Sequence, residues 1–392
     1  IAHDGKKDIR ILRKYGIEIT PFIFDTAIAA YILNPMRDSY NYDDISSEFL
    51  GEICPSEEEI LGKGKSKISI FELDSEKRAE FAARQALVNY SAKSVMDSKL
   101  KENGQTSLYY DIELPLIFVL ADMENYGIKV DKKTLEKYKA SLEESIEETT
   151  KEIYELAGEE FNINSPKQLG VILFEKLGLH GGKKTKTGYS TAAEVLESLK
   201  YESPIVEKIL YYRQIAKLKS TYADGLLAVI NEDDSRIYST FNQTITATGR
   251  ISSTEPNLQN IPVRLELGRE FRKVFIPDDG YTFVDADYSQ IELRVLAHMA
   301  DDETLINAFK EGQDIHRLTA SQVFNVDFDK VTSKQRSDAK AVNFGIIYGM
   351  GAFSLAKDLG ITKKMAEDYI KGYFVLFKDW KLLLGFVTII VA

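Results

Sequence analysis

Two acidic residues follow a β-rich segment in the second half of the chain. Residues 280–284 predict a strand, and residues 295–299 predict a helix soon after it. Because alternate residues of a strand share a face, Asp285 and Asp287 would project from the same side. Three more polar side chains follow them, namely Gln290, Glu292 and Arg294. This arrangement suits a metal or phosphate site, and the alternative is an exposed strand edge with solvated acids.

A second pattern repeats every four residues and consists of Arg336, Lys340, Phe344 and Tyr348. In a helix these side chains would lie along one slowly turning face and span about 18 Å at about 1.5 Å per residue. Two cations followed by two aromatic rings suit a nucleotide, with the cations on the triphosphate and the rings on the sugar and base. Fixed cations there would stabilise charge that develops during phosphoryl transfer. The alternative is an amphipathic helix with an aromatic core stripe and a basic edge.

Both patterns resemble motifs of the family A DNA polymerases. Residues 287–294 match motif A of that family over eight contiguous positions, and residues 335–349 match motif B, the O-helix of the fingers. The resemblance implies nucleotidyl transfer, with Asp287 and Lys340 as catalytic residues. It also implies a Mg²⁺ site at Asp287 and the neighbouring Tyr288, whereas Asp285 matches no acid that the family needs. It further implies dNTP binding by Gln290, Glu292, His316, Arg336, Lys340, Phe344 and Tyr348.

The segment 246–262 holds one glycine, two prolines, many hydroxyl groups and three amide side chains, which is typical of a loop that contacts a polar partner. Arginine and amide side chains can donate to the minor-groove acceptors that every base pair presents. The family resemblance implies that Arg250, Asn257, Gln259 and Asn260 lie along a primer–template. The alternative is a surface loop whose turns satisfy their own hydrogen bonds.

Residues 1–105 predict a mixed α/β domain that resembles the second half of an RNase H-like 3′–5′ exonuclease domain. Asp8 matches one metal-binding aspartate of such domains. The Tyr-x-x-x-Asp pattern expected on the last helix is replaced by Phe81 and Gln85. A two-metal nuclease needs several carboxylates, so we expect that this domain no longer edits and that Asp8 has a structural role.

The expected fold class is therefore α+β and multidomain. A partial RNase H-like α/β domain precedes a right-hand polymerase domain with a helical thumb, an antiparallel-sheet palm and helical fingers, incomplete at its C-terminus. The expected ranges are 1–105 for the exonuclease-like domain and 106–392 for the polymerase domain. Within the latter they are about 130–228 for the thumb, 229–310 for part of the palm, 311–374 for part of the fingers and 375–392 for a divergent tail.

The chain has 392 residues, a formal net charge of −11 and one cysteine. The single cysteine excludes an intramolecular disulfide framework and favours a cytoplasmic protein. The negative charge does not exclude nucleic acid, because the local field of a cleft matters more than the sum. Apolar residues 380–392 would reach only about 20 Å, too short for a bilayer core of about 30 Å. We expect a monomer that does not associate with membranes.

The expected function is that of a DNA-directed DNA polymerase in DNA replication and repair. The chain begins at Ile1 and has no match to the later motif C, which supplies the second metal-binding aspartate of the family. We therefore expect an incomplete copy with little or no activity. The alternative is a catalytically inactive fragment that binds primer–template and nucleotide.

Overall fold

The computed structural model describes residues 1–19, 24–180, 182, 184–185, 188–200, 202–262 and 266–376. The chain divides into two compact units, Ile1–Phe283 and Val284–Ala392. The division falls inside the range expected for the palm. Each unit is described below by itself.

The N-terminal part of the first unit is built from helices around one apolar core. Asp25 begins helix α2 (Thr26–Leu33) by accepting hydrogen bonds from the N–H groups of Ala27 and Ile28. The core includes Phe24, Met96 and Tyr109, all fully buried. The helices of this part are α1 (Gly5–Arg13), α2, α3 (Tyr42–Ile45), α4 (Glu57–Leu61), α5 (Ser75–Glu102) and α6 (Leu114–Tyr126).

The prediction of strands in residues 1–105 is wrong for the residues that the structure describes there. These contain helices and one isolated parallel bridge between Ala2 and Asp25. The bridge cannot extend into a ladder because the chain enters helix α1 at Gly5 on one side and helix α2 at Thr26 on the other. The last helix expected in this domain, which carries Phe81 and Gln85, is α5.

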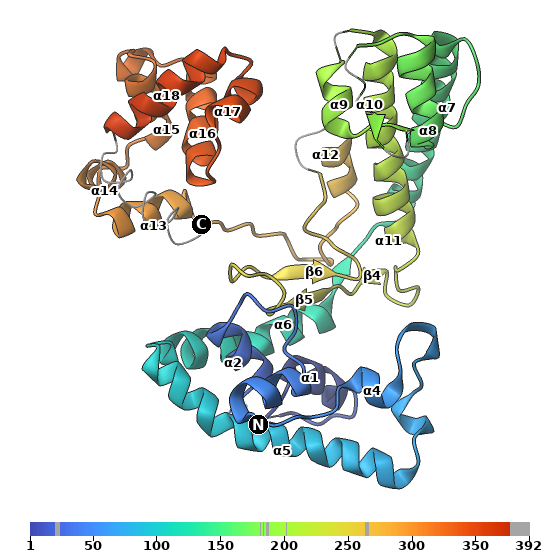
Figure 1. Cartoon of the computed structure of the whole chain (residues 1–392), viewed down its shortest axis with the longest axis vertical. Coiled ribbons are helices and arrows are strands. Elements are labelled where there is room, and N and C mark those ends of the chain that lie inside the picture. Colours follow the sequence, from blue (N-terminus) through green and yellow to red (C-terminus); the bar gives the residue numbers. More distant parts are fainter. Residues whose placement is uncertain are drawn as a thin grey trace. The chain divides into compact units, whose positions relative to one another are not determined.

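The rest of the first unit is dominated by two long helices, α7 (Lys132–Ala157) and α10 (Pro204–Lys217), which pack against each other (Figure 1). Asp131 caps the start of α7 by accepting from the N–H of Thr134, and Gly158 ends it with a φ of 71°. The remaining helices are α8 (Pro166–Gly170), α9 (Ala193–Ser198), α11 (Gly225–Leu227) and α12 (Glu266–Arg272).

The strands of the first unit are short and form antiparallel pairs. Strand β1 (Ile128–Lys129) pairs with β4 (Arg236–Ile237), β2 (Lys184–Thr185) with β3 (Gly188–Tyr189), and β5 (Thr240–Asn242) with β6 (Ser252–Thr254). In the last pair Phe241 lies opposite Ser253. Antiparallel pairing is therefore present within the range expected for the palm.

The second unit is helical in its described part. Its core gathers apolar side chains from several helices, including Leu293, Leu305, Val342 and Tyr373. Thr332 caps the start of α16 with a capping box. The Thr332 hydroxyl accepts from the Gln335 N–H, and the Gln335 side chain accepts from the Thr332 N–H. The helices are α13 (Ile291–Ala300), α14 (Glu303–Lys310), α15 (Ile315–Val323), α16 (Ser333–Ile347), α17 (Ala352–Leu359) and α18 (Lys363–Leu376).

The predicted strand over 280–284 is wrong, because residues 281–288 have neither strand nor helix. All eight of these residues are exposed, and Val284 is 86% exposed. A strand requires a neighbouring strand to pair its backbone groups, and none pairs with this segment in the described part of the chain. The helix expected after it is confirmed by α13.

The apolar segment 380–392 lies outside the described residues. Among the residues that are described, we find no helix with the length and apolar character needed to cross a membrane.

Candidate functional site

The four-residue pattern falls on helix α16, as predicted. Arg336 and Lys340 are exposed, Phe344 is half-buried, and Tyr348 is an exposed residue at the C-terminal cap of the helix. The Lys340 Nζ lies 6.0 Å from the centre of the Phe344 ring. The helix therefore presents two cations followed by two aromatic rings, which is the order that suits a nucleoside triphosphate.

Arg336 is held by Asp314, the acidic residue that caps the start of the preceding helix, α15. Its Nε donates to Asp314 Oδ2 at 2.6 Å, and the same carboxylate caps α15 by accepting from the Arg317 N–H. Both side chains remain partly exposed. An anion that binds Arg336 would therefore meet a guanidinium that is already oriented, together with a competing carboxylate.

His316 lies in the buried layer beneath this face of α16. Its ring is 2% exposed and its centre lies 5.9 Å from that of Phe344. Burial lowers the pKa of His316 to about 4, with Asp314 raising it and Arg336 and Lys340 lowering it. His316 is therefore neutral at neutral pH, and it can act as a hydrogen-bond donor but not as a cation.

Two buried polar residues that the sequence did not single out hold this histidine. Asn343 Nδ2 lies 2.8 Å from His316 Nδ1, and Thr319 Oγ1 donates to Asn343 Oδ1 at 3.0 Å. Asn343 and Thr319 are both fully buried. An asparagine between Val342 and Ile346 on an apolar helix face was the available sign, because such a residue needs buried partners.

The acidic segment ahead of α13 is exposed. Asp287 and Tyr288 are exposed, and Gln290 caps α13 in a left-handed conformation with a φ of 55°. Gln290 is half-buried, and its Oε1 atom is buried without a hydrogen-bond partner. Glu292 lies half-buried in the first turn of α13. Asp285 is exposed as well.

Arg294 fixes the turn that leads into α13. Its Nε donates to the Ser289 carbonyl at 2.8 Å, and its guanidinium lies 4.4 Å from the centre of the Phe309 ring. The structure thus brings Arg336, Lys340, Phe344 and His316 into one cluster. No hydrogen bond or ion pair joins Asp287 to that cluster among the described residues.

The four predicted primer–template residues lie in the first unit, and all of them are exposed. The Gln259 amide donates to the Ile251 carbonyl at 2.7 Å, and Asn257 Oδ1 accepts from the Gln259 N–H at 3.0 Å. Asn260 accepts through its carbonyl from the Tyr222 hydroxyl. Arg250 follows Gly249 in the turn between β5 and β6. Part of the loop is thus tied down by its own hydrogen bonds while its amide groups stay at the surface.

A cleft of about 410 Å³ separates this loop from the end of α10 and the helical segment that follows it. Asn257 and Asn260 line it on the loop side, and Lys217 and Thr221 line it on the helical side. A cation facing two amides matches what a nucleic-acid backbone and its minor groove require.

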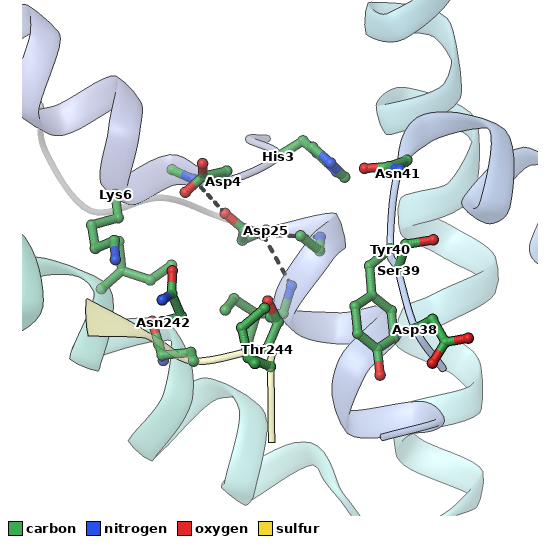
Figure 2. A pocket seen from close by; sticks show the side chains of 16 residues that line it. His3, Asp4, Lys6, Asp25, Asp38, Ser39, Tyr40, Asn41, Asn242 and Thr244 are labelled. Carbon is green, nitrogen blue, oxygen red and sulfur yellow. Dashed lines mark hydrogen bonds between the residues drawn. The ribbon is translucent and has the colours of Figure 1, made fainter. Parts of the chain in front are cut away.

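The exonuclease-like part contains a separate pocket whose buried acid, Asp25, is engaged in the fold (Figure 2). Asp25 is fully buried and accepts from the N–H groups of Gly5, Ala27 and Ile28, so it serves as a helix cap. Asp8 lines a neighbouring cavity that also contains Phe81 and Gln85, the two residues that depart from the editing pattern. That this part no longer edits stays a prediction.

The described residues contain no group of three histidine, cysteine, aspartate or glutamate side chains arranged to hold a metal ion. Mg²⁺ is commonly held in nucleotide-processing proteins by one or two carboxylates together with phosphate oxygens and water. The exposed carboxylate of Asp287 fits that smaller role, and a nucleotide would supply the other oxygens.

Comparison with known proteins covers both parts of the chain. Residues 132–384 match the family described as DNA polymerase family A, and residues 1–91 match the ribonuclease H-like domain of DNA polymerase I. The first match extends into the segment 375–392 that was expected to diverge.

Curated relatives include the DNA polymerase I of Bacillus subtilis, 48% identical over 96% of this chain and 43% of that protein. The DNA polymerase I of Lactococcus lactis subsp. lactis is 51% identical over 95% of this chain and 42% of that protein. The chain thus spans less than half the length of these relatives. Among solved structures, the POL domain of Pol1 from M. smegmatis, in complex with DNA primer-template and dNTP, matches with a TM-score of 0.83 and 36% identity. That match covers 96% of this chain and 63% of the other.

Proposed function

The chain belongs to DNA polymerase family A, with an RNase H-like domain ahead of a mostly helical polymerase domain, and from this premise we propose that the whole protein is a DNA-directed DNA polymerase. It would transfer a nucleotide from a dNTP to the 3′-OH of a primer paired with a template. We further propose that it acts as a cytoplasmic monomer in DNA replication and repair. The similarity to a polymerase solved with primer-template and dNTP supports the choice of partners.

The observation that carries this proposal is the face of helix α16. Arg336 and Lys340 are exposed on it, Phe344 follows, and a neutral His316 lies beneath. We assign the triphosphate to the two cations, the sugar to Phe344, and the base or its template partner to Tyr348. Gln290 and Glu292 would border the sugar, and Glu292 would disfavour a 2′-hydroxyl.

In the proposed reaction the primer 3′-oxygen forms a bond to the α-phosphorus while the bond to pyrophosphate breaks, and the 3′-OH gives its proton to solvent water. Lys340 and Arg336 would hold the phosphate oxygens and stabilise the negative charge that gathers on the pyrophosphate. Asp287, with the Tyr288 backbone beside it, would hold Mg²⁺. When bound, Mg²⁺ would act as a Lewis acid and neutralise negative charge on the reacting oxygens.

The loop with Arg250, Asn257, Gln259 and Asn260 would contact the primer–template. Its exposed amide and guanidinium groups can donate to acceptors that all base pairs share, so contact there would not depend on sequence. The cleft beside Lys217 gives the nucleic-acid backbone a cationic wall.

Binding of dATP with Mg²⁺ to the chain, measured by equilibrium dialysis, tests the nucleotide site. A charge-assisted hydrogen bond contributes about 1.5–3 kcal/mol, so Lys340→Ala should weaken binding about tenfold to hundredfold. Lys334→Ala is the matched control, because Lys334 is an exposed lysine of the same helix that pairs with Asp338 at 3.0 Å. At 3.6 residues per turn it points about 120° away from Lys340. Equal affinities for the two variants would refute the assignment.

A second candidate function is binding without catalysis by these 392 residues. It is favoured by the exposed position of Asp287, which no hydrogen bond or ion pair joins to the α16 cluster among the described residues. Primer extension with Mg²⁺ and all four dNTPs, measured beside filter binding of primer–template, separates the two candidates. Retention of DNA with no extension would favour the second, and robust extension would exclude it.

A further inference from the structure

Three buried polar side chains are linked by hydrogen bonds between helices α15 and α16. Thr319 Oγ1 donates to Asn343 Oδ1 at 3.0 Å, and Asn343 Nδ2 lies 2.8 Å from His316 Nδ1. Thr319 lies one helical turn after His316 on α15. None of the three side chains is more than 2% exposed, so solvent does not compete for these hydrogen bonds.

This arrangement determines which nitrogen of His316 carries the proton. With its oxygen engaged by Thr319, the Asn343 amide presents its N–H group to the ring, so His316 Nδ1 must accept. A neutral imidazole that accepts at Nδ1 carries its hydrogen on Nε2. His316 is therefore a donor at Nε2.

That donor has no partner. His316 Nε2 is a buried atom with no hydrogen-bond acceptor in the structure. Buried polar groups are nearly always paired, so an unpaired N–H indicates a partner that binds from outside. The charged groups that act on the ring are Asp314, Arg336 and Lys340, and the two cations lie on the exposed face of α16. Their net charge is positive, which favours an anionic acceptor.

We propose that Asn343, supported by Thr319, is a positioning residue that holds His316 as an Nε2–H donor for a phosphate oxygen of the nucleotide bound at α16. This inference rests on the proposed nucleotide site and adds to it the residues that orient the histidine. Because Nε2 is covered in this structure, neighbouring side chains move when the phosphate binds. A neutral donor at this position would select a phosphate by hydrogen-bond geometry, while Arg336 and Lys340 supply the charge.

The test is the ¹⁵N spectrum of the chain labelled only at histidine. The chain has four histidines, and His316→Gln identifies the signals of interest. At pH 7 we expect His316 to show one fixed neutral form with the proton on Nε2. Addition of dATP and Mg²⁺ should move the Nε2 signal more than the Nδ1 signal. A proton on Nδ1, or an even mixture of the two forms, would overturn the inference.

Variants separate positioning from stability. Asn343→Ala and Thr319→Val should each replace the single form by a mixture, and dATP binding should weaken about threefold to tenfold, as for the loss of one neutral hydrogen bond. Thr319→Ser keeps the hydroxyl and should retain the wild-type spectrum and affinity. If Asn343→Ala fails to fold, the comparison of Thr319→Val with Thr319→Ser still decides the point.

The outcomes distinguish this inference from the proposed function. If dATP binds and responds to Lys340→Ala, but the Nε2 signal does not move, the positioning role is refuted while the nucleotide site stands. If dATP does not bind to the unsubstituted chain, the nucleotide site is refuted, and the inference falls with it. A melting temperature that falls in the variants without any change in the ring spectrum would show that Asn343 only supports packing.

Discussion

Replacing Glu124 should destabilise the first unit far more than replacing its near neighbour Asp122 on helix α6. The Glu124 side chain is 0% exposed, and its carboxylate binds Lys6 Nζ at 2.6 Å and Arg10 Nη1 at 2.8 Å. It also accepts from the Phe241 N–H at 2.7 Å. One buried carboxylate therefore joins α1, α6 and β5.

The loss of unfolding free energy depends on which charged or polar groups each substitution leaves without a partner. Removing one partner of a buried ion pair costs about 3–5 kcal/mol. Arg10 is 36% exposed and can rehydrate, so Glu124→Ala should lower the free energy of unfolding by about 3 kcal/mol, near the lower bound of that range. Glu124→Gln keeps an oxygen for the Phe241 N–H, so its loss should be about 2 kcal/mol. Asp122 is 65% exposed and pairs with Arg13, so Asp122→Asn should lose less than about 1 kcal/mol.

Urea-induced unfolding of the full chain, followed by circular dichroism, measures these differences. A chain with two units can unfold in more than one step, so hydrogen exchange should be measured in parallel. Amides of α1 and β5 should exchange faster in Glu124→Gln and remain protected in Asp122→Asn. Equal losses for the two variants, or unchanged protection of α1, would refute the assignment of a structural ion-pair centre to Glu124.

Three further predictions concern the second unit. Replacing Asp314 with Asn keeps a helix-capping residue but releases Arg336 from its ion pair at 2.6 Å. The affinity of the chain for tripolyphosphate at low salt should therefore rise by up to about threefold, and an unchanged affinity would contradict a role of Arg336 in anion binding. His316 has a folded pKa of about 4 against 6.5 unfolded, so the unfolded chain binds the extra proton first and stability falls as pH drops from about 6.5 to 4. The contribution of His316 should approach about 3 kcal/mol by urea unfolding, and the loss over this range should be smaller by that amount in His316→Gln, with the contribution of the half-buried His3 remaining. Replacing Thr332 with Ala breaks the capping box with Gln335 and should lower the free energy of unfolding by about 1 kcal/mol, whereas Thr332→Ser should be close to neutral. Equal losses for the two variants would show that the Thr332 hydroxyl does not contribute to stability.

The helices could be predicted because their signals are local. An acid just before the first residue and a glycine just after the last residue mark the two ends of α7 in the sequence, and both act on backbone groups within a few residues. The four-residue spacing of the motif on α16 is likewise a property of one helix. Neither prediction needed knowledge of a distant segment.

The prediction of a strand over 280–284 was wrong because a strand depends on a distant segment of the chain. Its alternating apolar residues satisfy the sequence pattern of a strand, but pairing depends on a second segment that the pattern does not specify. The two-residue and three-residue strands elsewhere in the first unit were also invisible in the sequence, because each is defined by its partner. Asp287 was therefore identified by its motif, while its position relative to α16 could not be derived.

The cluster of side chains beneath α16 could be predicted from the sequence only in part. Spacing placed Phe344 on the same face as Lys340, but only the packing of α15 against α16 decides that Phe344 is half-buried beside His316. His316 and Asn343 are 27 residues apart, and nothing in that separation predicts a hydrogen bond of 2.8 Å. Once the contact is known, the histidine that the family resemblance assigned to nucleotide binding can be described as a neutral donor with a fixed tautomer. The sequence therefore indicates which side chains are candidates for a nucleotide site, but their protonation states follow from the residues behind them.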